Sequence, residues 1–74
     1  MPAPADSMTA RAFSERFKPF LPVRRIAEAA GFKENTWYTA VSRGRTLTPD
    51  ERARLRAAVE AHVAEVRTMA DDLA

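Results

Sequence analysis

The sequence contains no cysteine, only two glycines and a single histidine. The absence of cysteine excludes disulfides, thiol chemistry and cysteine-based zinc sites, and it fits a reducing compartment. With one histidine and no cluster of other ligands, we expect neither a metal site nor a cofactor. No apolar run is long enough to span a bilayer, and no signal peptide is recognisable. We therefore expect a cytoplasmic protein that does not associate with a membrane.

Patterns that support enzyme chemistry are also missing. There is no phosphate-cradling glycine loop and no plausible pair of nucleophile and base, so we do not expect an enzyme, and no small-molecule effector site is evident. The 74 residues allow one small domain with a modest core. The net charge is only +2, but it is unevenly distributed. Five cations and two acids give residues 22–45 a charge of +3, which is the modest footprint of a nucleic-acid binder.

Residues 22–45 predict a helix, a sharp turn and a second short helix. Pro22 suits a first helical turn, and the apolar residues that follow it recur at helical spacing up to Ala30. Gly31 then stands where a helix usually ends on a left-handed residue. The second helix carries Trp37, and Gly44 closes it in the same way. Residues 35–42 also have strand propensity, but propensity is a weak prior and the bracketing glycines favour a helix.

This stretch resembles the helix-turn-helix of Cro and the lambda-type phage repressors. That family has a small residue inside its first helix, a glycine four residues later and an apolar residue after the glycine, matched here by Ala27, Gly31 and Phe32. Buried positions of the second helix are matched by Trp37 and by Ala40 with Val41. The cap that often follows the apolar residue is missing, because Lys33 stands there. We expect Asn35 or Thr36 to cap instead, with a late helix start.

The flanking segments predict two further helices, which makes an all-α fold of about four helices. Residues 1–7 are expected to be disordered, and Ser7 or Thr9 is expected to cap a first helix that ends near Lys18. Its aromatic residues at spacings of four and three should face the core: Phe13, Phe17 and Phe20. After a short linker over residues 45–47, Thr48 and Glu51 form a capping-box pattern.

Nothing interrupts the last helix from Pro49 to about Leu73. Its length exceeds what a core built on three short helices can cover, yet apolar residues continue at spacings of four and three. We interpret the distal stripe as the seam of a homodimer. The alternative is that the last two turns fray or fold back on a crevice of the same chain. We divide the chain into a DNA-binding domain, residues 8–58, and a dimerisation segment, residues 59–74. The predicted dimer contacts are Val59, His62, Val63, Val66, Met69 and Leu73.

The resemblance implies that the second helix enters the major groove of DNA. The side chains expected to face bases are Lys33, Glu34, Asn35, Tyr38, Thr39 and Ser42. For each of them a solvated surface residue is the alternative, and for Asn35 a helix cap. The residues expected to contact phosphates are Arg24, Arg25, Thr36, Arg43 and Arg45. The arginines at positions 52, 54 and 56 are interpreted mainly as a solvated helix surface.

The sequence therefore predicts a dimeric, sequence-specific regulator of phage or bacterial type that binds double-stranded DNA. Repression by promoter occlusion is the expected mode, because the chain has no room for an effector domain. One alternative is a helical adaptor that binds another protein. Another is a DNA-packaging or DNA-organising component that uses the same motif.

Overall fold

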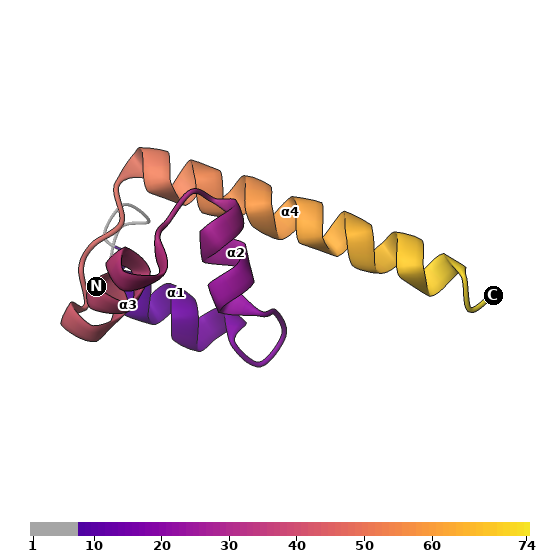
Figure 1. Ribbon diagram of the computed structural model, residues 1–74, viewed down its shortest axis with the longest axis horizontal. Coiled ribbons are helices and arrows are strands. Elements are labelled where there is room, and N and C mark those ends of the chain that lie inside the picture. The colour runs from indigo at the N-terminus through magenta and orange to yellow at the C-terminus, as the bar shows by residue number, and fades with distance from the viewer. Residues whose placement is uncertain (1–7) are drawn as a thin grey trace, which may run out of the picture.

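The computed structural model describes residues 8–74, which form four α-helices. The helices are α1 (Ala10–Phe17), α2 (Val23–Ala29), α3 (Glu34–Arg43) and α4 (Pro49–Asp71). The first three gather at one end of α4, and the rest of α4 extends away from them (Figure 1). The prediction of an all-α fold with a long last helix is confirmed. The predicted disorder of residues 1–7 lies outside the described residues.

An aromatic cluster forms the centre of the three-helix domain. Phe13 of α1 meets the edge of Trp37 of α3, with ring centroids 5.8 Å apart. Phe32, in the turn between α2 and α3, meets Trp37 at 5.0 Å. The three rings are buried, and edge-to-face pairs of this kind stabilise beyond their area burial. The predicted core position of Trp37 is confirmed.

Two apolar residues lie where the sequence did not place them. Phe20 was predicted to face the core, but its side chain is 81% exposed. Helix α1 ends at Phe17, so Phe20 falls in the turn before Pro22 and no longer follows the helical spacing. Leu47, assigned to a linker, is 1% exposed. Its N–H donates to the Met8 carbonyl at 2.8 Å, so the linker runs beside residues 8–10 and carries Leu47 into the core.

The two glycines have positive φ angles, +95° at Gly31 and +63° at Gly44. Beside each glycine, an arginine from another helix donates a hydrogen bond to a carbonyl at the end of the preceding helix. Arg54 of α4 donates to the Ala30 carbonyl at 3.3 Å and lies over the Phe32 ring at 5.7 Å. The Arg54 side chain is 47% exposed, as its interpretation as helix surface implies, but its guanidinium also spans the turn between α2 and α3.

At the other glycine, Arg11 of α1 performs the same capping role for α3. Its Nε donates to the Val41 carbonyl at 3.1 Å, and its Nη2 donates to the Ser42 carbonyl. The last carbonyls of a helix have no partner within the helix, so Arg11 satisfies two of them. These contacts fix the end of α3 against α1, and they set the direction in which α3 presents its outer face.

Replacing Gly31 by alanine should lower the free energy of unfolding by about 1–2 kcal/mol, because a side chain is strained at this φ. The added Cβ would also come within 3.2 Å of Arg54 Nη1, which would have to shift and would strain its bond to the Ala30 carbonyl. Gly44→Ala is the matched control, since its Cβ would meet nothing nearer than 3.7 Å. Urea unfolding followed by circular dichroism measures both. Equal losses would contradict a role for Arg54 at the turn.

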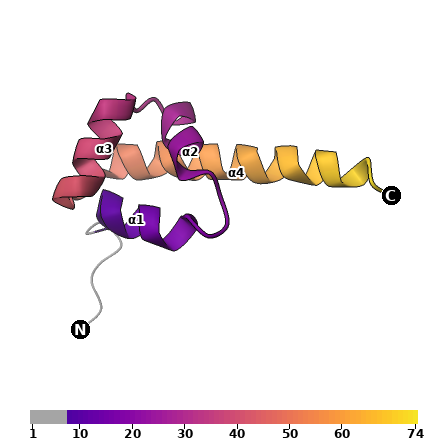
Figure 2. The same ribbon diagram turned by 60° about the horizontal axis from the view of Figure 1, so that its bottom comes forward.

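Helix α4 begins with the predicted capping box, which is confirmed. Thr48 Oγ1 accepts from the Glu51 N–H at 3.1 Å, and the Glu51 carboxylate accepts from the Thr48 N–H at 2.9 Å. Leu55 and Ala58 are buried against the domain, and α2 is the helix that packs on α4. Beyond them α4 is clear of the other helices in both orientations (Figure 2). The helix ends at Asp71, so Leu73 lies in the turn that follows it.

Candidate nucleic-acid interface

Helix α3 is held by one face and exposes the other. Trp37 and Ala40 are buried, and Val41 is partly buried. The helix begins at Glu34, and no side chain caps it. The predicted cap at Asn35 or Thr36 is therefore wrong, because both residues lie inside the first turn. Their side chains are exposed to solvent instead.

All six side chains predicted to face bases are exposed: Lys33, Glu34, Asn35, Tyr38, Thr39 and Ser42. They follow the face of α3 opposite Trp37 and Ala40. The Tyr38 side chain, next to buried Trp37, is 73% exposed. Amide, ammonium and hydroxyl groups of this kind can hydrogen-bond base edges. The structure thus leaves a polar face of the required composition open to solvent.

The cations around α3 fall into two groups. Arg24 of α2 pairs with Glu34 of α3, and both side chains are more than 70% exposed. Arg45 grips Glu51 through two bonds of 3.0 and 2.8 Å. Within residues 8–74, Arg25 and Arg43 make no ion pair. Of the five residues predicted to contact phosphates, Arg25, Thr36 and Arg43 are therefore exposed and uncommitted, whereas Arg24 and Arg45 already hold carboxylates.

The Arg24–Glu34 pair changes the electrostatics of the α3 face. A lone carboxylate at this position would repel DNA phosphates, and the adjacent guanidinium offsets its charge. The pair joins the two helices of the motif on their outer side. Its net contribution to stability is small, because exposed ion pairs contribute about 0–1 kcal/mol. Its consequence is to hold the Glu34 carboxylate in one place on the exposed face.

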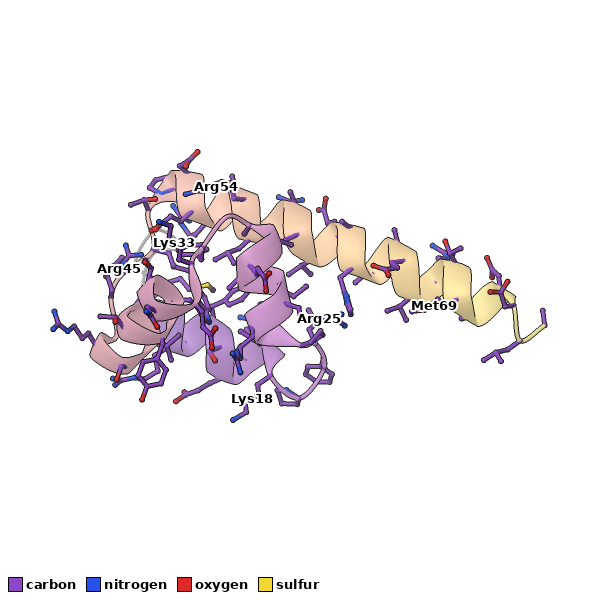
Figure 3. All side chains as sticks on the ribbon, viewed as in Figure 1. Lys18, Arg25, Lys33, Arg45, Arg54 and Met69 are labelled. Atoms are coloured by element: carbon purple, nitrogen blue, oxygen red, sulfur yellow. The ribbon has the colours of Figure 1, made fainter. Side chains whose placement is uncertain are left out.

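A shallow groove of 1310 Å³ runs beside α3, between the end of α1 and the start of α2. Its lining residues include Phe32 and Trp37 together with Lys18, Arg24 and Lys33. Lys18 was missed as a candidate for this surface. It follows α1 and extends away from the domain (Figure 3). No local pattern could have found it, because only the packing of α1 on α3 brings it to the groove.

The predicted dimer residues are partly buried at the start of the distal segment of α4 and exposed from Val63 onward. Val59 and His62 are partly buried, whereas Val63, Val66 and Met69 are 53%, 44% and 54% exposed. Leu73 is 88% exposed. No helix within residues 8–74 is both long and apolar enough to cross a membrane. The same residues contain no group of three or more histidine and acidic side chains able to hold a metal ion.

Comparison with known proteins found no match to a family model, to a curated protein or to a solved structure.

Proposed function

We propose that the protein binds double-stranded DNA in a sequence-specific manner and acts as a transcriptional regulator, with α3 inserted into the major groove. The proposal draws on the likeness of the α2–α3 segment to the Cro and lambda-repressor helix-turn-helix. A major groove about 12 Å wide admits a single helix, and α3 lies at the surface with its polar face open. We expect it to repress by occluding a promoter.

One observation supports this proposal above the others. Helix α3 follows the turn at Gly31, which Arg54 spans, and Arg11 holds its last carbonyls beside Gly44. Apart from Glu34, which pairs with Arg24, the exposed polar side chains of its outer face have no hydrogen-bond partner within residues 8–74. A short helix held this firmly, with amide, hydroxyl and ammonium groups facing outward, suits the reading of base edges. Arg43 ends this helix, is exposed and makes no ion pair within residues 8–74, so it is free to hold the DNA backbone.

Electrophoretic mobility shift with the DNA upstream of the gene tests the proposal. The wild-type chain should give a discrete complex that resists non-specific competitor DNA and weakens steeply as salt rises. Lys33→Ala combined with Tyr38→Ala should lower the affinity on the order of 100-fold or more, because each base contact contributes about 1–3 kcal/mol. Circular dichroism should show an unchanged fold.

Arg67→Ala is the matched control for this experiment. It removes one positive charge, as Lys33→Ala does, but from the distal part of α4. Its affinity should remain close to that of the wild type. Equal losses in both variants would show that charge alone drives binding, and the absence of any complex at low salt would favour the helical adaptor.

A further inference from the structure

The distal part of α4 carries an apolar stripe that nothing in its own chain covers. The stripe continues the face on which Leu55 is buried, through Val59 and His62 to Val66 and Met69. These residues alternate spacings of four and three, the pattern of a helix that packs on another helix. Val63 adds a further exposed side chain at its edge. The face is therefore built for a partner, and its position excludes the three-helix domain of the same chain (Figures 1 and 2).

Charge is segregated between the two parts of the molecule. Residues 8–59 hold eleven lysines and arginines against five acids, a net charge of +6. Residues 60–74 hold one arginine against four acids, a net charge of −3. Two distal segments laid side by side would repel each other, as each would repel DNA. The acidic segment, residues 60–74, is attracted to a basic domain. It cannot reach the domain of its own chain, because α4 extends away from that domain (Figure 1).

We infer that two copies of this chain form a crossed dimer, in which the acidic distal half of each α4 packs on the basic three-helix domain of the other. The surface of the three-helix domain that would receive the partner's helix lies on the side from which α4 extends away (Figure 1). There the turn between α1 and α2 projects below α4 (Figure 1) and carries Phe20, 81% exposed. Arg25 points toward the same side (Figure 3) and makes no ion pair within residues 8–74.

The area favours the crossed arrangement over a simple pairing of distal halves. Covering one face of α4 over residues 60–71, roughly 18 Å of helix, removes on the order of 400 Å². A stable interface takes about 800 Å² from each partner. In the crossed dimer each chain contributes both its distal helix and its domain surface, which doubles the buried area. Phe20 and the apolar stripe are then buried in the same interface.

Sedimentation equilibrium of the full chain tests this arrangement without DNA, so its outcome is independent of the proposed DNA binding. The 8.2 kDa chain should sediment as a dimer whose dissociation constant rises as salt screens the opposite charges. Val66→Asp should raise that constant at least 100-fold, and Phe20→Ser at least 10-fold. Neither should lower the helix content, because both side chains are exposed. Ala64→Asp, on the opposite face of α4, is the control and should leave the dimer intact.

Three results would overturn the inference. A monomeric wild-type chain would show that the stripe does not bind a second copy. An assembly larger than a dimer would show that the contact is not reciprocal between two chains. A dimer that tightens with added salt and ignores Phe20→Ser would show that the distal halves pair side by side. Met69→Cys reports on this last case directly, because the chain has no other cysteine. Rapid formation of a disulfide dimer would place the two copies of position 69 together, which the crossed dimer forbids.

Discussion

Trp37→Ala should leave the chain largely unfolded at room temperature. The indole is 6% exposed and packs against Phe13 and Phe32 from α1 and the motif turn. Replacing a buried tryptophan by alanine costs about 3–5 kcal/mol. The core of so small a domain rarely gives a free energy of unfolding above about 3–5 kcal/mol. The expected loss therefore equals the entire stability of the fold. Far-ultraviolet circular dichroism and urea unfolding should show no cooperative transition.

Tyr38→Ala is the control for this variant, because it removes the neighbouring aromatic ring of the same helix. That ring is 73% exposed, so the free energy of unfolding should change by less than about 0.5 kcal/mol. The two adjacent substitutions therefore separate the fold from the proposed DNA contact. A folded Trp37→Ala chain, or an unfolded Tyr38→Ala chain, would show that α3 faces the other way.

The α2–α3 unit and the start of α4 could be predicted because their signals are local. Ala27, Gly31 and the apolar residues around them follow the period of a helix and its termination, and Thr48 with Glu51 forms a cap within one turn. The predicted late start of α3 was wrong. A cap at Asn35 or Thr36 was inferred from residue type, whereas the Trp37 N–H donates to the Lys33 carbonyl at 2.9 Å and the helix begins at Glu34 without a side-chain cap.

Contacts between distant parts of the chain were not predictable. Leu47 is buried because residues 45–47 lie beside residues 8–10. The end of α1 was also not predictable: the helix stops at Phe17, before the apolar spacing that includes Phe20 is complete, so Phe20 is exposed. Arg54 reaches Ala30 across 24 positions of sequence. The exposed face of α3 was predicted correctly from helical spacing. The pairing of Arg24 with Glu34 on that face depends on how two helices cross, and no sequence pattern records it.

Acid should destabilise this fold through one carboxylate more than any other. Glu51 accepts two bonds from Arg45 and one from the Thr48 N–H. These bonds, the Arg45 pair foremost, lower the pKa of Glu51 from 4.5 to about 2. A carboxylate whose pKa is depressed by folding adds stability that is complete above the unfolded value. That stability is lost as the pH falls from about 4.5 toward 2.

The magnitude follows from the shift and from the exposure of the pair. A shift of this size corresponds to roughly 3 kcal/mol without screening, but the Arg45 side chain is 42% exposed, so we expect about 1–2 kcal/mol. Glu51→Gln should lose this amount at neutral pH and should show a flatter fall in stability between pH 4.5 and 2. Urea unfolding at a series of pH values measures both quantities.

Glu60→Gln supplies the comparison, because Glu60 also pairs with an arginine on α4. Its contact with Arg56 is 3.0 Å long, but both side chains are more than 60% exposed. Solvent screens such a pair, so this variant should lose less than about 0.5 kcal/mol at neutral pH. Equal losses in the two variants would mean that the Arg45–Glu51 contact does not anchor α4. The helix would then be held to the domain by buried Leu55 and Ala58 and by the contacts of Arg54 with Ala30 and Phe32.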